Sequence, residues 1–226
     1  GKISESFAEK AAKHCLVIDN SSFFRMDPDV PLVVPQVNSS DLNNIKKNII
    51  ANPNCSTAQL VIALKPLHDL FVIKRIVVST YQSVSGAGKA SMDELFEQTK
   101  LALDGKNIKL QNFTKQIAFN AIPHIDIFSE DGYTKEELKM RNETKKILGD
   151  IIDLTATCVR LPISVSHSEA VNIQFQKSFS LKKVREALDN FEGCKVIDER
   201  VDGGYITPLD AAGKNETCVS RIREDK

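Results

Sequence analysis

The order of helix-like and strand-like segments constrains the fold of this chain most. Residues 4–14 place apolar and small side chains at a helical period, and they lead directly into a buried-strand pattern at 15–19. A parallel strand is normally reached through a crossover helix, so this pair is typical of the end of an α/β unit. The chain therefore opens inside such a unit, and we expect further sequence upstream.

Beyond residue 30, strands and helices follow one another without strict alternation. Pro66 would kink or weaken one predicted helix, and Ser180 would cap another. The predicted helices are 41–47, 55–70, 92–103, 135–148 and 181–190, and the predicted strands are 32–34, 49–51, 75–80, 154–161, 170–175 and 195–197. This order predicts an α+β domain, with a mixed sheet and helices, appended to the remnant of an α/β domain.

Composition excludes several classes of function. The 30 Lys and Arg residues balance the 30 Asp and Glu residues, whereas nucleic-acid binders usually carry a basic surplus. The longest apolar stretches, such as 60–64, are too short to span a membrane, and the N-terminus has no apolar signal-peptide core. Five cysteines without a CxxC pair or zinc-ligand spacing indicate a reducing compartment and no metal site. We therefore expect a soluble, cytoplasmic protein that binds neither nucleic acid nor membrane.

Cys55 is the sharpest local feature. It follows the strand and proline turn at 51–54 and stands at the start of a long predicted helix. A thiol in that position feels the positive end of the helix dipole and free backbone N–H groups, which would lower its pKa and make it a nucleophile. The same N–H groups could serve as an oxyanion hole. The alternative is an inert buried cysteine.

A cysteine nucleophile needs a base, and the chain has four histidines. His167 lies in the polar stretch 160–169 between two predicted strands, where a side chain can reach into a cleft. His68 ends an apolar helix and suits a structural role better. The residues alone leave the pairing of Cys55 with His167 open.

Six blocks of the sequence closely resemble the aspartate-semialdehyde dehydrogenase family, in that family's order. The blocks are 17–22 with 24–27, 33–38, 52–57, 79–82 with 85–88, 143–147 and 160–169. The resemblance extends from about residue 1 to about residue 221. It implies a glyceraldehyde-3-phosphate dehydrogenase-like catalytic and dimerisation domain at 54–226, preceded by a remnant of an NADP-binding Rossmann domain at 1–53.

The family resemblance also implies a reaction. Cys55 would attack the small-molecule substrate aspartyl phosphate to form a thioester, which NADP(H) would reduce to the semialdehyde of the pathway to lysine, threonine and methionine. His167 would be the acid/base, and Gln82 would orient the substrate. Without the resemblance, Gln82 is better read as a solvated side chain. Family members are usually dimers, so we expect a homodimer.

The remaining functional positions come from the same resemblance. Arg160 would bind the α-carboxylate of the substrate and Glu143 its ammonium group, while Arg25 and Lys146 would bind phosphate. An exposed i,i+3 ion pair is the alternative for Glu143 and Lys146. The positions that match cofactor contacts are Ser85, Gly86 and Pro123.

This sequence departs from the family by having no glycine-rich dinucleotide loop, so most of the N-terminal Rossmann half is expected to be missing. The C-terminal end of the family is also expected to be missing. NADPH should then bind this chain weakly. The chain is a fragment of a complete enzyme, a truncated product with a reactive thiol, or a degenerate binding or dimerisation module. A cysteine hydrolase is the best alternative enzyme, although its local signatures are absent. A glyceraldehyde-3-phosphate dehydrogenase-like enzyme fits the block 160–167 poorly.

Overall fold

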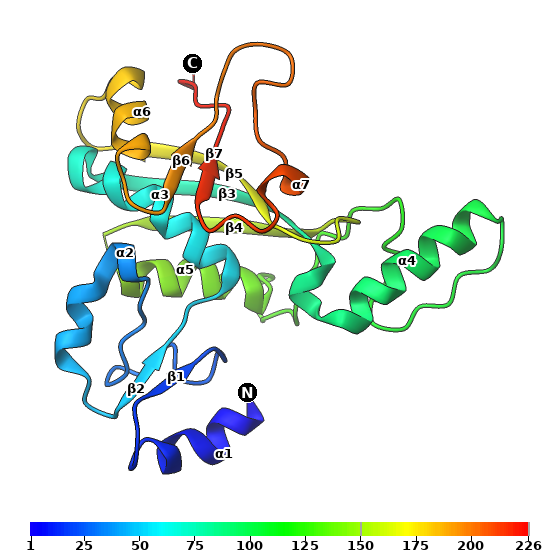
Figure 1. Cartoon of the computed structure of the whole chain (residues 1–226), viewed down its shortest axis with the longest axis horizontal. Helices are drawn as coiled ribbons and strands as arrows, with labels where there is room; N and C mark the ends of the chain where they lie inside the picture. Colours follow the sequence, from blue (N-terminus) through cyan, green and yellow to red (C-terminus); the bar gives the residue numbers. More distant parts are fainter. Residues whose placement is uncertain (150, 226) are drawn as a thin grey trace.

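The computed structural model describes residues 1–149 and 151–225. It contains a small N-terminal unit, a central sheet with helices on one face, a projecting arm and a C-terminal unit (Figure 1). The α-helices are α1 (Lys2–Ala11), α2 (Pro35–Asn38), α3 (Cys55–Phe71), α4 (Lys89–Leu103), α5 (Lys135–Leu148), α6 (Leu181–Asp189) and α7 (Pro208–Ala211). The strands are β1 (Val17–Asp19), β2 (Ile49–Ala51), β3 (Ile73–Gln82), β4 (Asp153–Arg160), β5 (Ser168–Phe175), β6 (Cys194–Val196) and β7 (Thr217–Val219), and two 3-10 helices are η1 (Ser39–Asn44) and η2 (Val84–Ala87).

The N-terminal unit is built on the parallel pair β1 and β2. Its core is apolar and includes Phe24, Val30, Ile49 and Ala51, and it continues onto α3 through Val61. This arrangement is the expected end of an α/β unit, in which a parallel pair is covered by helices.

Two predictions in the N-terminal unit are wrong. The helix expected at 41–47 is replaced by α2 and η1, which end at Asn44. The strand expected at 32–34 is reduced to a single bridge between Leu32 and Ala51. The Asn38 side chain explains both, because its amide accepts from the Val34 N–H at 2.9 Å and donates to the Leu32 carbonyl at 2.8 Å. Such side-chain bonds compete with regular helix and strand pairing.

The central sheet has the strand order β4-β3-β5, with β3 parallel to β4 and antiparallel to β5, which confirms the predicted mixed sheet. Alternate residues of β3 and β4 point to one face, where Ile76 and Leu154 pack with Leu64 of α3 and Met140 of α5. Helix α3 continues through Pro66 to Phe71 because its flanking leucines are held in this core, which offsets the lost backbone hydrogen bond. The sheet thereby carries the ends of β3 and β4 to the N-terminus of α3.

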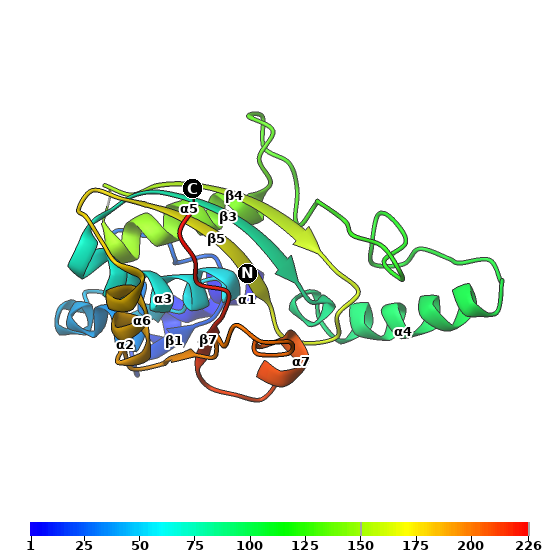
Figure 2. The ribbon, with the colours of Figure 1, turned by 90° about the horizontal axis from the view of Figure 1, so that it is seen from above.

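An arm formed by η2, α4 and the loop at 104–134 projects from the end of β3 (Figures 1 and 2). It has a small core of its own, made of Val84, Leu95, Ile117 and Ile122. Helix α4 begins at Lys89, one turn earlier than predicted, because Gly88 with φ +96° lets the chain turn into the helix there.

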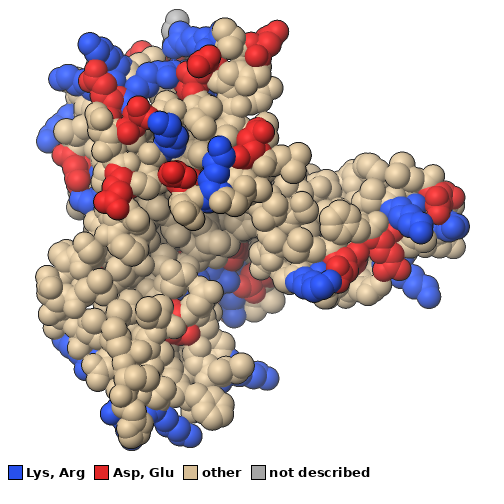
Figure 3. Space-filling model, in the orientation of Figure 1, with Lys and Arg blue, Asp and Glu red and all other residues tan. Residues whose placement is uncertain are grey.

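The C-terminal unit pairs β6 with β7 in parallel and packs α6 against α3. Ser180 caps α6 by accepting from the Lys183 N–H, as predicted. Lys and Arg side chains intermix with Asp and Glu over this unit and the arm on the face drawn in Figure 3. Among the described residues, no helix is both long and apolar enough to cross a membrane.

Candidate active site

Cys55 is the first residue of α3, directly after the turn that leaves β2. The Asn54 side chain caps this helix, because its Oδ1 accepts from the N–H groups of Ser56 at 3.0 Å and Thr57 at 3.4 Å. Cys55 itself remains exposed to solvent. Since Asn54 already uses two N–H groups of the first turn, the oxyanion hole expected from them is partly occupied by the cap.

The pKa of the Cys55 thiol is raised, so the predicted lowering is wrong. The protein that surrounds the sulfur disfavours the thiolate, and the Glu136 carboxylate adds repulsion. The backbone N–H of Ser56 and the Arg160 guanidinium act in the opposite direction but do not overcome these effects. The thiol therefore needs a base to become a nucleophile.

His167 lies beside β3, next to the left-handed residue Ser166 with φ +70°. Its Nδ1 accepts from the Ser83 N–H at 3.0 Å and lies 3.1 Å from the Ser83 hydroxyl. The backbone donor favours the neutral tautomer with the proton on Nε2. In the other neutral tautomer, Nδ1–H donates a hydrogen bond to the Ser83 hydroxyl and Nε2 is free to accept a proton. Burial and the nearby Arg160 lower the pKa of His167, so the ring is neutral at neutral pH.

His167 and Arg160 both lie against Gly86. A Cβ built on Gly86 would lie 3.2 Å from His167 Nε2 and 3.3 Å from Arg160 Nη1. Arg160 Nη1 is fixed by donating to the Ser83 carbonyl at 2.5 Å. Any side chain at position 86 would crowd both groups, so the glycine keeps the space in front of them open.

Gln82 ends β3 and connects to a residue that the sequence analysis did not select, Glu136. Gln82 is 1% exposed, its Oε1 accepts from Thr80 Oγ1 at 3.0 Å, and its Nε2 donates to Glu136 Oε1 at 3.1 Å. Glu136 Oε1 also accepts from Asn54 Nδ2 at 2.9 Å, next to Cys55. The Glu136 carboxylate therefore links the end of β3 to the turn at 52–54 that precedes Cys55, called the nucleophile turn below.

Lys139 completes this network, since its Nζ lies 3.2 Å from Glu136 Oε2 and 2.8 Å from Asp126 Oδ2. Charge from Lys139 and hydrogen bonds from Asn54 and Gln82 outweigh burial and lower the pKa of Glu136. The sequence could have indicated the Glu136–Lys139 pair, because these residues have the same i,i+3 spacing, on the same helix, as Glu143 and Lys146.

Glu143 and Arg25 occupy a different, neighbouring network. The buried Glu143 carboxylate accepts from Arg25 Nη1 at 3.1 Å and from the Asn54 N–H at 2.6 Å. Arg25 Nη2 donates to the Asn20 carbonyl at 3.1 Å, and its buried Nε has no hydrogen-bond partner in the described residues. Glu143 therefore ties Arg25 to the turn that precedes Cys55.

Lys146 fixes the connector, residues 25–31, which carries Arg25. Its Nζ donates to the carbonyls of Arg25 at 2.8 Å, Asp27 at 2.7 Å and Val30 at 2.8 Å. These bonds use all three protons of the ammonium group, so in this conformation none is left for a phosphate. The exposed ion pair considered as an alternative is also absent, because Glu143 bonds to Arg25 and Lys146 to the connector.

Two of the three positions matched to the cofactor, Ser85 and Gly86, lie beside His167 and Arg160. The Ser85 hydroxyl lies 2.9 Å from that of Ser83, and Gly86 faces His167 and Arg160. Pro123 is exposed and follows Ile122, whose backbone pairs with that of Arg160. The structure thus brings together Cys55, Gln82, Arg160, His167 and the loop at 83–88, and sets Arg25, Glu143 and Lys146 behind the nucleophile turn.

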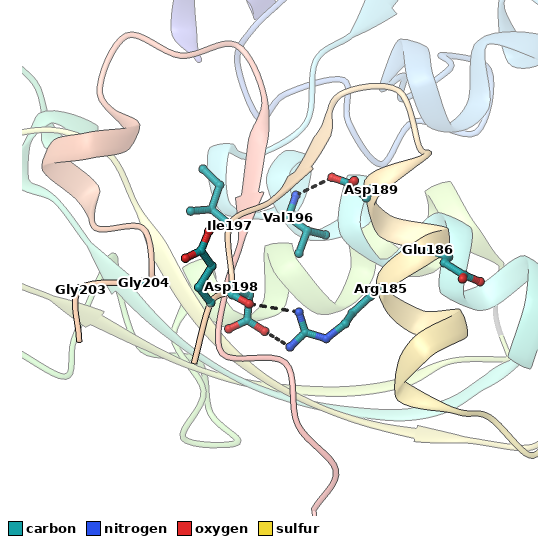
Figure 4. Close-up of a pocket in the computed structure, with 9 residues that line it drawn as sticks. Arg185, Glu186, Asp189, Val196, Ile197, Asp198, Gly203 and Gly204 are labelled. Carbon is teal, nitrogen blue, oxygen red and sulfur yellow. Dashed lines mark hydrogen bonds and ion pairs between the residues drawn. The ribbon is translucent and has the colours of Figure 1, made fainter. Parts of the chain in front are cut away.

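A second concave surface lies between α6 and β6, away from these residues (Figure 4). Arg185 there donates to the Asp198 carboxylate, whose oxygens also accept from the Arg221 and Ile222 N–H groups at 2.7 and 3.1 Å. Arg185 and Asp198 are thus paired with each other within the fold. In the described part of the chain, no group of three or more His, Cys, Asp or Glu side chains could hold a metal ion.

We expect Glu136→Gln to shift the reactivity of Cys55. The amide keeps the acceptor for Asn54 and Gln82 but removes the negative charge that disfavours the thiolate. The thiol pKa should fall, so iodoacetamide should alkylate Cys55 at lower pH than in the wild type, measured by peptide mass mapping across a pH series. The matched control is Glu97→Gln, an exposed glutamate on α4, and an unchanged or higher midpoint for Glu136→Gln would contradict the assignment.

Comparison with known proteins identifies the families that this chain matches. The family described as semialdehyde dehydrogenase, dimerisation domain matches residues 64–226, and the semialdehyde dehydrogenase NAD binding domain matches residues 1–45. The aspartate-semialdehyde dehydrogenase of Aquifex aeolicus is 54% identical over 100% of this chain and 68% of its own length.

Solved structures give the same picture. Aspartate semialdehyde dehydrogenase II from Vibrio cholerae, complexed with ASA, superposes with a TM-score of 0.96 and 45% identity, and the match covers 100% of this chain and 67% of that one. The Candida albicans enzyme, solved with NADP, superposes with a TM-score of 0.68 and 25% identity over 98% of this chain and 65% of its own. The chain is similar to these proteins along its whole length.

Proposed function

Because this chain belongs to the aspartate-semialdehyde dehydrogenase family, we propose that it forms the thiol-based site for NADPH-dependent reductive dephosphorylation of aspartyl 4-phosphate to aspartate 4-semialdehyde. One observation carries this proposal. Cys55 is exposed at the N-terminus of α3, and the charges of Glu136 and Arg160 both act on its thiol. Arg160 also acts on His167, and Gly86 lies against both of these side chains.

The chemistry begins with sulfur. His167 acts as the base in its Nδ1–H tautomer, in which Nδ1 donates to the Ser83 hydroxyl and Nε2 carries no proton. Cys55 Sγ gives its proton to this Nε2 and attacks the acyl carbonyl of the substrate. A carbon–sulfur bond forms, the carbon–oxygen bond to phosphate breaks, and phosphate leaves with the bonding electron pair. The raised pKa of the Cys55 thiol makes this base necessary.

The second half releases the aldehyde. A bound nicotinamide cofactor would supply the hydride that reduces the thioester carbonyl. As the carbon–sulfur bond then breaks and the carbonyl re-forms, His167 Nε2 returns its proton to Sγ. Gln82 is held by Thr80 and Glu136 so that its amide can polarise the reacting carbonyl.

Substrate charges match the side chains around this thiol. Arg160 is buried with one arm fixed on Ser83, and its guanidinium would take the α-carboxylate in a bidentate pair. We assign the ammonium group to Glu136 rather than Glu143, since Glu136 contacts Gln82 directly. Lys139 is the cationic donor for phosphate, because Arg25 is held by Glu143 behind the nucleophile turn and Lys146 has no proton left to donate.

The residues present fit a nicotinamide ring at the loop 83–88. Gly86 leaves open the space that a side chain would fill against His167 and Arg160, which a flat ring needs in order to approach the reacting carbon. Ser85, Gly86 and Pro123 would hold the ring there. We propose NADP(H) as the cofactor; the match of residues 1–45 to a NAD binding domain and the neighbour solved with NADP support this choice.

We also propose a homodimer that works in the reducing cytoplasm. The family match is a dimerisation domain, and no helix of residues 1–149 and 151–225 packs on the face of the central sheet that exposes Arg75 and Tyr81. All five cysteines are free, as expected of a protein in a reducing compartment.

Acyl transfer to sulfur tests the proposed function directly. The chain is incubated with aspartyl phosphate, quenched in acid and mapped by peptide mass, and we expect an aspartyl group on Cys55 that is absent from Cys55→Ser. Released phosphate should match the acyl group in amount. Acylation of another residue, or none at all while the protein remains folded, would contradict the proposal.

A further inference from the structure

One hydrogen bond joins helix α3, which begins at Cys55, to strand β5, which follows His167. Gln59 Nε2 donates to Glu169 Oε1 at 2.7 Å. Gln59 stands one helical turn after Cys55, so both side chains lie on the same side of α3. Glu169 stands two residues after His167, at the start of β5, and both side chains line one cavity.

The setting of Glu169 is unusual for a carboxyl group. No ion pair reaches it within the described residues, and the surrounding protein raises its pKa to about 8, with Gln59 as the hydrogen-bond partner that opposes this shift. Glu169 is half-buried, and withdrawing a carboxyl group from water costs stability relative to an apolar side chain of similar size. Its pairing with Gln59 is therefore better explained by the site it adjoins than by the stability of the fold.

Helix α3 and strand β5 contact each other in two ways. Ile173 and Phe175 of β5 pack against the core cluster that contains Leu60 and Leu64 of α3. Gln59, Glu169 and His167 instead line a cavity of about 950 Å³, which is also bordered by α6 and by residues 206–225. Beside this cavity, the Gln59–Glu169 hydrogen bond is a directional contact between the two elements.

We propose that the Gln59–Glu169 hydrogen bond positions Cys55 relative to His167, which makes Gln59 and Glu169 positioning residues for the thiol chemistry. This proposal rests on the proposed function, because it takes Cys55 as the nucleophile and His167 as its base. Neither residue touches the substrate in this assignment; both act through the two groups that do.

The test measures how fast iodoacetamide alkylates Cys55 between pH 6 and pH 9, read by peptide mass mapping of the whole chain. Glu169→Leu and Gln59→Leu remove the hydrogen bond, and each should slow alkylation at pH 7 by roughly five- to tenfold, a fraction of what a well-placed base contributes. Glu169→Gln keeps an acceptor for Gln59 and should stay within about twofold of the wild type. Lys65→Met, which breaks the exposed Lys65–Asp69 pair on the same helix, is the matched control.

Two readouts separate positioning from general damage to the fold. Glu169→Leu should melt no lower than Glu169→Gln, because an apolar side chain at this half-buried position, which Leu60 and Leu64 also border, leaves no polar group withdrawn from water. In a His167→Asn background, Glu169→Leu should have no further effect on the alkylation rate, since the pair it aligns is already broken. A full effect of Glu169→Leu in that background, or equal slowing in Glu169→Gln, would overturn the proposal.

The same experiment distinguishes the two proposals. If His167→Asn leaves the Cys55 alkylation rate unchanged, the assigned base is wrong and the proposed function loses its support. If His167→Asn slows alkylation while Glu169→Leu and Gln59→Leu do not, the function stands and the positioning role is rejected.

Discussion

Replacing Cys55 by serine should reduce acylation by aspartyl phosphate by about 10⁴-fold or more, as expected when a covalent nucleophile is lost. The hydroxyl keeps the cap geometry made by Asn54 but ionises far less readily than a thiol, so His167 cannot activate it. Stability should barely change, because the side chain is exposed. The measurement is the rate of acyl-protein formation under identical conditions, followed by intact mass.

Cys15→Ser is the control for the loss of acylation, since Cys15 is also an exposed, free cysteine and lies on the N-terminal unit. It should acylate at the wild-type rate. A loss smaller than about tenfold in Cys55→Ser would remove Cys55 from the role of nucleophile.

The largest effect on stability is expected from Glu143→Leu, at about 3–5 kcal/mol in the free energy of unfolding, because it breaks a buried ion pair on one side. The substitution leaves the Arg25 guanidinium buried without its carboxylate and the Asn54 N–H without its acceptor. Urea unfolding should show a lower midpoint at an unchanged slope. Burial raises the pKa of Glu143, so Glu143→Gln, which resembles the neutral acid, should cost less.

A double variant locates the origin of this cost. Adding Arg25→Met to Glu143→Leu removes the unpaired charge and should recover part of the lost stability. Glu186→Leu, which breaks the exposed Lys182–Glu186 pair on α6, should leave the midpoint nearly unchanged. Equal midpoints for Glu143→Leu and Glu186→Leu would mean that Glu143 does not fasten Arg25 to the nucleophile turn.

Most secondary structure followed from local signals. Helix α5 occupies the predicted 135–148, and its Thr134–Glu137 capping box marks the start in the sequence itself. Helix α3 begins at Cys55, as the Asn54 cap requires. The errors at 32–34 and 41–47 arose because the Asn38 side chain takes backbone partners, a competition that apolar patterning does not reveal.

The candidate site was predictable only in part. Glu136 and Glu143 lie two turns apart on one face of α5, and both have a lysine three residues later, so the sequence gives no reason to prefer either. The choice depends on where β3 ends along the helix. Gln82 meets α5 at Glu136, whereas Arg25 and the Asn54 N–H meet it at Glu143.

The sequence by itself determined the mixed α+β architecture, the family and the place of Cys55 at the head of a capped helix, because periodicity, capping and motif order are local properties of the chain. Only the tertiary structure decided that the Cys55 pKa is raised, that Lys146 donates three hydrogen bonds to the connector, and that Gln59 donates to Glu169. These depend on burial and on charges brought together from distant segments, and both arise only when the chain has folded.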